Sequence, residues 1–277
     1  MLLVFGLGYT ASALAARLRT KGWAVTGTSR DGRDGTIAFG DEAAVSRAIA
    51  GASHILSSVP PEREADSVLA AYGPALATSD AWLGYLSSTG VYGDAGGAWV
   101  DEGTPTGGGR RGARASADAA WLERGARVFR LPGIYGPGRS PLDRIAAGRA
   151  HRIAQPGQVF SRVHVDDIVS GVIAGFVAPP GAYNLADDLP ASQNDVIAFA
   201  ARLLGRDPPP FIALEQLSPE ARAFYAENRR VANGRAKRVL GWRPLYPDYR
   251  AGLRAISAMT SPAIASTAPT PASTDQR

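Results

Sequence analysis

The sequence has 277 residues, of which 30 are basic, 25 are acidic and three are histidine, and it has no cysteine. Without cysteine the chain has neither a disulfide framework nor a thiol nucleophile, and with three histidines we expect no metal site. The formal net charge is +5, but only two of the basic residues are lysines and the arginines form no concentrated stripe. We therefore expect no nucleic-acid partner.

No apolar stretch is long enough to span a membrane, and the chain enters its first predicted strand directly. We therefore expect neither a signal peptide nor a transmembrane segment, no membrane partner, and a cytoplasmic location. The oligomeric state has no signature in the sequence.

The first predicted elements are a buried strand, a glycine turn and a helix. Residues 2–5 form a continuous apolar run, as expected of a parallel strand that is covered on both faces. The two glycines after it allow a tight turn and a close approach of the backbone to a phosphate, and a small third residue lets the helix pack on the strand. The free N–H groups at the helix start suit a pyrophosphate. The predicted cofactor turn consists of Gly6, Gly8, Tyr9, Thr10 and Ala11.

The second predicted strand, residues 23–28, leads into Ser29 and Arg30. At this place a carboxylate suits the ribose 2′-hydroxyl of NAD, whereas an arginine suits the 2′-phosphate of NADP. Arg30 therefore favours NADP, with Ser29 beside it in the cofactor site. Asp31 follows directly and keeps NAD open as the alternative.

Further strands are predicted at residues 36–39, 54–59 and 82–86, with a helix after Asp41 as its cap and a helical segment at 64–77. The strand at 54–59 ends in small and polar residues before two prolines. Because ligands of open α/β sheets lie at the carboxyl ends of the strands, we expect cofactor contacts at this exit. They are assigned to Ser57, Ser58, Val59 and Pro60.

The second half of the chain predicts a further lobe. A strand at 128–131 precedes a short helix capped by Ser140, a strand at 159–165 and a helix capped by Asp166. A strand at 183–186 and helices at 192–204 and 233–240 follow, with Trp242 packing under the lobe. We predict an α/β fold, a Rossmann-type doubly wound parallel sheet in one domain over residues 1–256. Its small C-terminal α/β substrate lobe comes mainly from residues 140–165 and 183–256, and the Ser/Thr/Ala/Pro-rich residues 257–277 form a disordered tail.

Several motifs follow the glycine turn in order. They are Ser87-Ser-Thr-Gly-Val-Tyr-Gly93, Arg130-Leu-Pro-Gly-Ile-Tyr-Gly-Pro-Gly-Arg139, Val163-His-Val-Asp-Asp-Ile168, Tyr183-Asn-Leu185 and Leu240-Gly-Trp-Arg-Pro244. Up to about residue 250, the chain resembles the extended short-chain dehydrogenase/reductases, the family of NAD(P)-dependent epimerases and dehydratases that act largely on nucleotide sugars. It is most similar to a divergent branch in which Gly-x-Gly-x-x-Ala replaces the usual glycine pattern.

The resemblance implies a cofactor and reaction site around the end of the strand at 82–86. Ser88 would hydrogen-bond the reacting hydroxyl or carbonyl, and the alternative for it is a capping serine at a strand exit. Ser87 would lie beside the cofactor. The loop that borders the nicotinamide would consist of Leu131, Pro132, Gly133 and Ile134.

The resemblance also implies residues that face the substrate. Tyr92 and Tyr135 are the catalytic candidates beside Ser88, and Tyr92 would also contact the substrate. Arg139 would pair with a phosphate or carboxylate of the substrate. For His164 two interpretations stay open, a substrate contact and a packing residue beside the following helix.

One departure from the family concerns its Tyr-x-x-x-Lys pair, in which tyrosine is the acid/base and lysine lowers the pKa of the tyrosine. The corresponding stretch here has neither residue, and Arg110 and Arg114 stand at the two positions. Arginine cannot lose its proton, so Arg110 cannot replace the tyrosine, although Arg114 would keep a positive charge near the cofactor ribose.

Three functions follow from these patterns. The first is an NAD(P)-dependent oxidoreductase or epimerase/dehydratase-like enzyme that acts on a small polar substrate, with sugar derivatives as one class. The second is an NADP-binding sensor or structural protein without chemistry, in keeping with the missing Tyr/Lys pair. The third, a nucleic-acid binder, depends on net charge alone and is the weakest.

Overall fold

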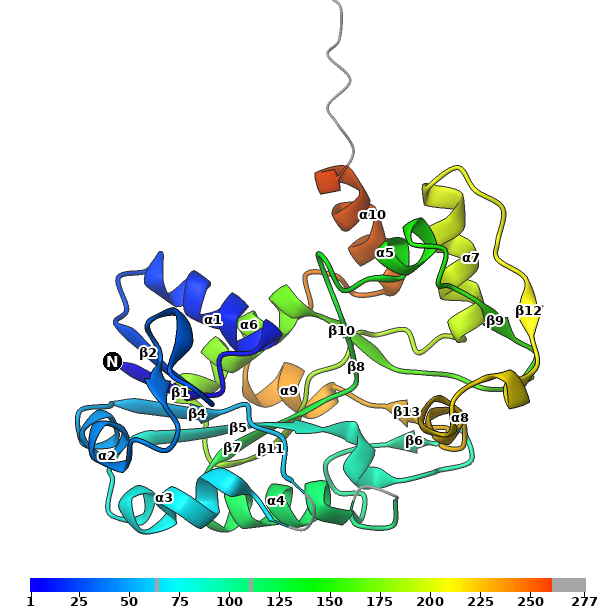
Figure 1. Ribbon diagram of the computed structural model, residues 1–277. Coiled ribbons are helices and arrows are strands. Elements are labelled where there is room, and N and C mark those ends of the chain that lie inside the picture. Colours follow the sequence, from blue (N-terminus) through cyan, green and yellow to red (C-terminus); the bar gives the residue numbers. More distant parts are fainter. Residues whose placement is uncertain (63–64, 110–111, 261–277) are drawn as a thin grey trace, which may run out of the picture.

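The computed structural model describes residues 1–62, 65–109 and 112–260. Seven parallel strands form one sheet in the order β11-β7-β5-β4-β1-β2-β3 (Figure 1). Their bounds are β1 (Leu2–Phe5), β2 (Val25–Ser29), β3 (Ile37–Ala38), β4 (His54–Ser57), β5 (Trp82–Ser88), β7 (Arg127–Leu131) and β11 (Gly181–Asn184). The strand order reverses beside β1, as the Rossmann-type prediction requires, and that prediction is confirmed.

Helices cover both faces of this sheet (Figure 1). One face carries α1 (Tyr9–Arg19) and α6 (Val165–Ala174), and the other carries α2 (Glu42–Ala50), α3 (Ser67–Ala77) and α4 (Gly112–Glu123). Side chains of β1 alternate between the two faces, because successive residues of a strand point in opposite directions. Leu2 and Val4 belong to the cluster under α1 and α6, whereas Leu3 and Phe5 belong to the cluster on the other face. All four are fully buried, which explains the continuous apolar run.

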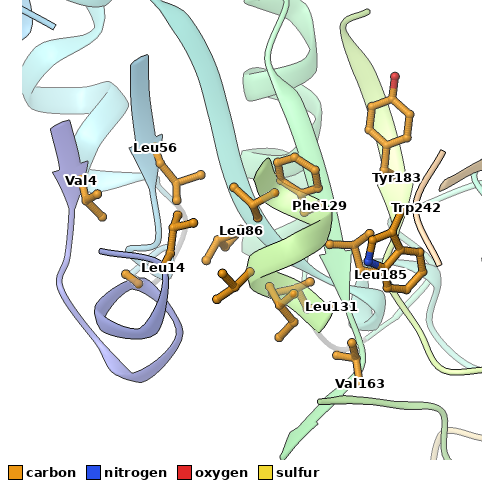
Figure 2. Packing of buried hydrophobic residues seen from close by; sticks show 14 of the residues in the cluster. Val4, Leu14, Leu56, Leu86, Phe129, Leu131, Val163, Tyr183, Leu185 and Trp242 are labelled. Atoms are coloured by element: carbon orange, nitrogen blue, oxygen red, sulfur yellow. The ribbon is translucent and has the colours of Figure 1, made fainter. Parts of the chain in front are cut away.

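The first cluster extends across the sheet from β1 to β11 (Figure 2). Leu14 of α1 and Phe129 of β7 pack in it, and so does Trp242. The indole Nε1 of Trp242 donates to the carbonyl of Asp167, at 3.1 Å, and to Ser170 Oγ, at 3.0 Å. Both partners lie on α6, so the prediction that Trp242 packs under the second lobe is wrong.

A second lobe adjoins the carboxyl edge of the sheet. The chain leaves β7 at Pro132 and enters β8 (Gly133–Tyr135), which pairs in parallel with β10 (Arg162–His164). The lobe helices α5 (Pro141–Ala146), α7 (Gln193–Leu203) and α10 (Tyr249–Thr260) share one apolar cluster. The remaining elements are α8 (Pro219–Tyr225), α9 (Gly234–Val239) and the short pairs β9 (Arg152–Ile153) with β12 (Phe211–Ile212) and β6 (Trp99–Val100) with β13 (Arg230–Val231).

Local signals placed the starts of α2, α5 and α7 correctly. Asp41 caps α2 by accepting from the N–H of Ala44, Ser192 caps α7, and Ser140 forms a capping box with Asp143. Residues 257–260 continue α10, so that part of the predicted tail is helical, and residues 261–277 lie outside the described residues. No helix in the described ranges is long and apolar enough to cross a membrane.

Candidate functional site

A cavity of about 510 Å³ lies at the carboxyl edge of the sheet, between the sheet and the second lobe. The start of α1 forms one wall, the end of β5 forms the floor, and the loop after β7 forms the opposite wall. The far end is closed by the lobe, with Phe160, Ser161, Phe224, Glu227 and Arg229. The cavity therefore lies at the place where open α/β sheets bind ligands.

The glycine turn opens into this cavity through Gly8, Tyr9 and Thr10. Gly6 has φ +82° and its carbonyl accepts from Ser58 Oγ at 2.5 Å, so the turn is tied to the exit of β4. Helix α1 begins after Gly8 without a side-chain cap and without an acidic residue in its first turn. Its first N–H groups suit an anion such as a phosphate. Ala11 is buried in the core and lets α1 pack on the sheet.

Two serines at the end of β5 have different environments. Ser87 Oγ donates to Asp118 Oδ2 at 2.6 Å and is buried. Ser88 is half-buried, lines the cavity floor, and its Oγ accepts from the N–H of Gly90 at 3.1 Å. This bond caps a short 3₁₀ turn, Thr89–Tyr92, and it leaves the O–H of Ser88 able to donate to a ligand oxygen. Ser88 therefore has both the capping role and access to the cavity.

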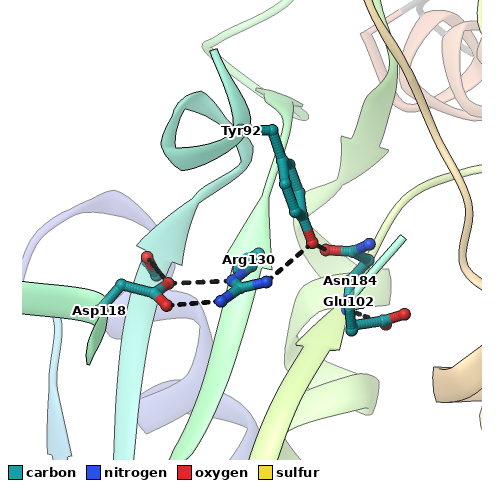
Figure 3. A network of polar contacts seen from close by, with 6 residues as sticks. Tyr92, Glu102, Asp118, Arg130 and Asn184 are labelled. Carbon is teal, nitrogen blue, oxygen red and sulfur yellow. Dashed lines mark hydrogen bonds and ion pairs between the residues drawn. The ribbon is translucent and has the colours of Figure 1, made fainter. Parts of the chain in front are cut away.

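A buried polar network adjoins the floor of the cavity, because Ser87 of the lining bonds to Asp118 of the network. Figure 3 shows the network. Arg130 donates to Asp118 twice, at 2.7 and 3.1 Å, and also to the Tyr92 hydroxyl at 3.0 Å. That hydroxyl donates in turn to Asn184 Oδ1 at 2.8 Å. Burial raises the pKa of Tyr92, although the positive charge of Arg130 opposes the rise. Tyr92 does not line the cavity, and its hydroxyl is used inside the fold, so its contact with the substrate stays a prediction that the cavity lining does not support.

Tyr135 and His164 also lie outside this cavity. Tyr135 packs in the apolar cluster of the lobe, and burial raises the pKa of its hydroxyl far above the ordinary value. His164 has no exposed surface, and its Nδ1 accepts from the N–H of Asp166 at 3.2 Å. His164, and not Asp166, therefore caps α6. His164 is a buried cap outside the lining of this cavity, so the packing interpretation describes its place in the fold, and its substrate contact stays a prediction.

Tyr135 lines a second cavity of about 620 Å³ inside the lobe. The two cavities adjoin, because Gly133, Ile134, Arg139, Phe160 and Phe224 line both. The rings of Phe160 and Phe224 are stacked, with centroids 4.7 Å apart and an interplanar angle of 8°. Arg139 lies over the ring of Tyr9 at 5.6 Å, so it reaches both the glycine turn and the lobe.

Arg114 brings a positive charge to the cavity floor. Its guanidinium donates to the Tyr85 hydroxyl at 3.0 Å and to the carbonyl of Leu86 at 3.5 Å. Burial raises the pKa of Tyr85 to about 12, against the opposing effect of Arg114. Arg110, at the position of the family tyrosine, lies outside the described residues. The described residues hold no group of three His, Asp or Glu side chains that could bind a metal ion.

The other predicted cofactor residues divide into two sets. Those that line the cavity are Ser58, Pro60, Ser87, Leu131, Pro132, Gly133 and Ile134. Ser57 and Val59 do not line it: Ser57 is fully buried in β4, and the Val59 side chain lies against Gly6. Ser29 and Arg30 lie at the end of β2, one strand further along the same edge of the sheet, where Arg30 is exposed.

Sequence patterns missed the far wall of the cavity. Glu227 and Arg229 form an ion pair with 2.8 Å between Oε2 and Nη1, and both are largely buried. They reach the cavity because Arg230 and Val231 pair with β6, which lies about 130 positions earlier in the sequence. The arginines around residue 229 carry no local signal that separates them from a solvated helix face.

Comparison with known proteins identified relatives that cover much of the chain, although no protein-family model matches it. Protein YeeZ of Escherichia coli (strain K12) is 28% identical over 274 residues, which cover 88% of this chain and 96% of YeeZ. The 3-diazoavenalumate denitrifying reductase of Streptomyces sp is 32% identical over 151 residues, which cover 50% of this chain and 48% of the reductase.

Solved structures cover a similar share of this chain. A functionally unknown conserved protein from Silicibacter pomeroyi DSS is 44% identical, with a TM-score of 0.82 over 93% of this chain and 98% of that one. The human epimerase family protein SDR39U1 with NADPH has a TM-score of 0.73 at 18% identity, over 93% and 99% of the two chains. The dTDP-glucose 4,6-dehydratase of Bacillus anthracis with NAD has a TM-score of 0.71 at 16% identity, over 93% of this chain and 95% of the dehydratase. The chain therefore belongs to one family with the Silicibacter pomeroyi protein, a divergent branch with the fold of the extended short-chain dehydrogenase/reductases.

Proposed function

We propose that the protein is an NAD(P)-dependent oxidoreductase or epimerase-type enzyme that acts on a small polar substrate. The observation that carries this proposal is a single cavity bounded by the uncapped start of α1, the Ser88 hydroxyl and the residues 131–134. A dinucleotide-dependent site has two ends. One is a helix start that suits a phosphate, and the other is a hydroxyl that can hydrogen-bond the reacting oxygen.

The residues of the cavity fit a nicotinamide dinucleotide. The N–H groups after Gly8 would hold the pyrophosphate, since a Cβ at Gly8 would meet no protein atom within 4 Å and the backbone is open to a ligand there. Arg114 would contribute positive charge near a ribose, and Leu131 and Ile134 would border the nicotinamide. When bound, the nicotinamide supplies or takes up a hydride. The Ser88 hydroxyl would donate a hydrogen bond to the substrate oxygen and orient it.

We propose NADP as the preferred cofactor, with NAD as the alternative. Arg30 is exposed at the carboxyl end of β2, where its guanidinium is available to a 2′-phosphate. Structures of similar fold contain either dinucleotide, NADPH in the human epimerase family protein and NAD in the Bacillus anthracis dehydratase. The fold alone therefore does not select between them.

The substrate belongs to a small-molecule class with polar groups. Arg139 and Arg229 line the cavity on the side of the lobe and suit a phosphate or carboxylate. The named substrates of the similar proteins differ, dTDP-glucose for the dehydratase and 3-diazoavenalumate for the reductase. Sugar derivatives are therefore one candidate class among anionic carbonyl and hydroxyl compounds.

A second candidate is a cofactor-binding protein without chemistry. Arg114 in place of the family lysine favours it, because a guanidinium fixed on Tyr85 is not positioned to tune an acid/base tyrosine.

One experiment separates the two candidates. NADPH and NADH are titrated onto the protein by fluorescence, and the loaded protein is then assayed for NAD(P)H oxidation with sugar-nucleotide and small carbonyl compounds. Turnover that falls by a factor of 10²–10⁴ in Ser88→Ala is expected of the enzyme. Tight NADPH binding without any turnover would favour the cofactor-binding protein, and no binding of either dinucleotide would refute both.

A further inference from the structure

In the described part of the chain, the two catalytic candidates beside Ser88, Tyr92 and Tyr135, do not line the cavity, and neither does His164. Two lining residues there have side chains whose protonation changes in ordinary enzyme chemistry, namely Tyr9 and Glu227. The lining arginines keep their proton and cannot serve.

Tyr9 is poorly placed for proton transfer to a substrate. It is the first residue of α1, and its hydroxyl donates to the carbonyl of Pro137 at 3.0 Å. Burial also raises the pKa of its hydroxyl. Its ring lies under the guanidinium of Arg139, beside the glycine turn. Tyr9 therefore belongs to the phosphate end of the cavity.

Glu227 lies at the opposite end, on the wall contributed by the lobe. Its side chain is 9% exposed, and Arg229 Nη1 lies 2.8 Å from its Oε2. The same nitrogen of Arg229 donates to the carbonyl of Gly93, the residue after the 3₁₀ turn that Ser88 caps. Arg229 therefore links the carboxylate to the segment that carries Ser88.

The backbone around Glu227 is held on both sides. Gln158 Nε2 donates to the carbonyl of Glu227 at 2.9 Å, and the N–H of Asn228 donates to Asp94 Oδ1 at 2.7 Å. These bonds connect the loop before β13 to the lobe and to the loop after β5. These bonds hold the backbone and the ion pair with Arg229 holds the carboxylate, so the side chain has a defined position without a ligand, as a proton-transferring group must.

We propose that Glu227 is the group that exchanges a proton with the reacting oxygen of the substrate, in place of the family tyrosine. The proposal rests on the proposed function. In the oxidising direction, the Glu227 carboxylate would accept the substrate O–H proton as the C–O bond becomes C=O, and a bound oxidised nicotinamide would take up the C–H hydride. The carboxylic acid then returns its proton to water. In the reducing direction each transfer is reversed, and Ser88 orients the same oxygen by a hydrogen bond.

The test uses the full-length protein with NADPH and the carbonyl compound that the wild type reduces. Glu227→Gln removes the transferable proton and keeps the shape of the side chain, so kcat should fall by a factor of 10²–10⁴. KM and the Kd of NADPH should change by less than about fivefold, because the amide still fills the wall. Glu227→Asp, which keeps the carboxylate and its charge, should retain more activity than Glu227→Gln. Glu123→Gln, an exposed glutamate at the end of α4, is the matched control and should match the wild type.

A second measurement does not depend on turnover. The same carbonyl compound is titrated calorimetrically into the cofactor-free protein in two buffers with different ionisation enthalpies. A carbonyl oxygen only accepts hydrogen bonds, so its binding favours the protonated carboxyl, and the wild type should take up a fraction of a proton. Glu227→Gln should bind the compound without this proton uptake. Arg114, Arg139 and Arg229, the charged groups that share the cavity, remain in both proteins.

The outcomes separate this proposal from the proposed function. Suppose that the wild type reduces a substrate and Glu227→Gln retains more than a tenth of the wild-type kcat, or shows the same proton uptake. The role of Glu227 would then be overturned, and the proposed function would stand. A wild type that binds NADPH and reduces nothing would overturn both. A Glu227→Gln protein that does not fold is replaced by Glu227→Met, which also lacks a transferable proton, and a kcat above a tenth of the wild-type value in that variant would overturn the proposal.

Discussion

The glycine turn makes a direct test of the cofactor site, through the substitution Gly8→Val. Gly8 has φ −83° and ψ −172°, an extended conformation that valine adopts freely, and a Cβ there would meet no protein atom within 4 Å. Valine is a poorer N-cap than glycine by roughly 0.5–1 kcal/mol, but it also lowers the entropy of the unfolded chain by a similar amount. The free energy of unfolding should therefore change by less than about 1 kcal/mol.

Unlike stability, the binding of NADPH should change strongly in Gly8→Val. Gly8 lines the cavity, so its new side chain would occupy space that a pyrophosphate needs beside the start of α1. We expect NADPH affinity to fall by on the order of a hundredfold or more, about 2.7 kcal/mol. The assay is titration of NADPH fluorescence, with urea unfolding to establish that the variant is folded. Gly112→Val is the control, because Gly112 also begins a helix, has open space around it and lies outside the cavity.

The result that would refute this reasoning is an unchanged NADPH affinity in folded Gly8→Val. The glycine turn would then not be the phosphate site, and the cavity would have to bind something other than a dinucleotide. A large loss of stability would instead contradict the open space described around Gly8. Gly6 offers the contrast. Its φ of +82° is unfavourable for valine, and a new Cβ there would lie 2.9 Å from a methyl group of Val59, so Gly6→Val should destabilise the fold.

Three further predictions concern charge. Arg30→Ala should weaken NADP binding by about 1.5–3 kcal/mol in calorimetry and leave NAD nearly unchanged; equal losses would argue against a 2′-phosphate contact. Asp118→Ala leaves Arg130, which is 4% exposed, without its carboxylate, so urea unfolding should show a loss of about 3–5 kcal/mol; a loss under 1 kcal/mol would contradict the network. Burial raises the pKa of Asp187 from 3.8 to about 8, so the folded chain holds a proton that the unfolded chain releases across this range. The free energy of unfolding of the wild type should therefore fall from pH 5 to pH 8, by about 1 kcal/mol or more beyond the fall measured for Asp187→Asn. Parallel curves of the free energy of unfolding against pH for the two proteins would exclude this linkage.

The sequence by itself determined the N-terminal part of the fold. A four-residue apolar run, two glycines and a helix with small residues on one side are local signals, and they specify the strand, the turn and the helix without distant partners. The caps at Asp41, Ser140 and Ser192 are equally local, because a cap bonds to an N–H three residues away. These elements could be predicted since their stabilising contacts lie within a few residues along the chain.

Only the tertiary structure decided which polar side chains face the cavity. Tyr92 and His164 stand in the motifs that suggested a substrate contact, yet their hydrogen bonds lie inside the fold, to Asn184 and to the start of α6. Glu227 had no motif, and it reaches the cavity because the strand after it pairs with β6. A tyrosine or a glutamate has the same local sequence signal whether it is buried, exposed or in a cavity. Its direction is set by packing between segments far apart in the chain, which spacing along the sequence does not encode.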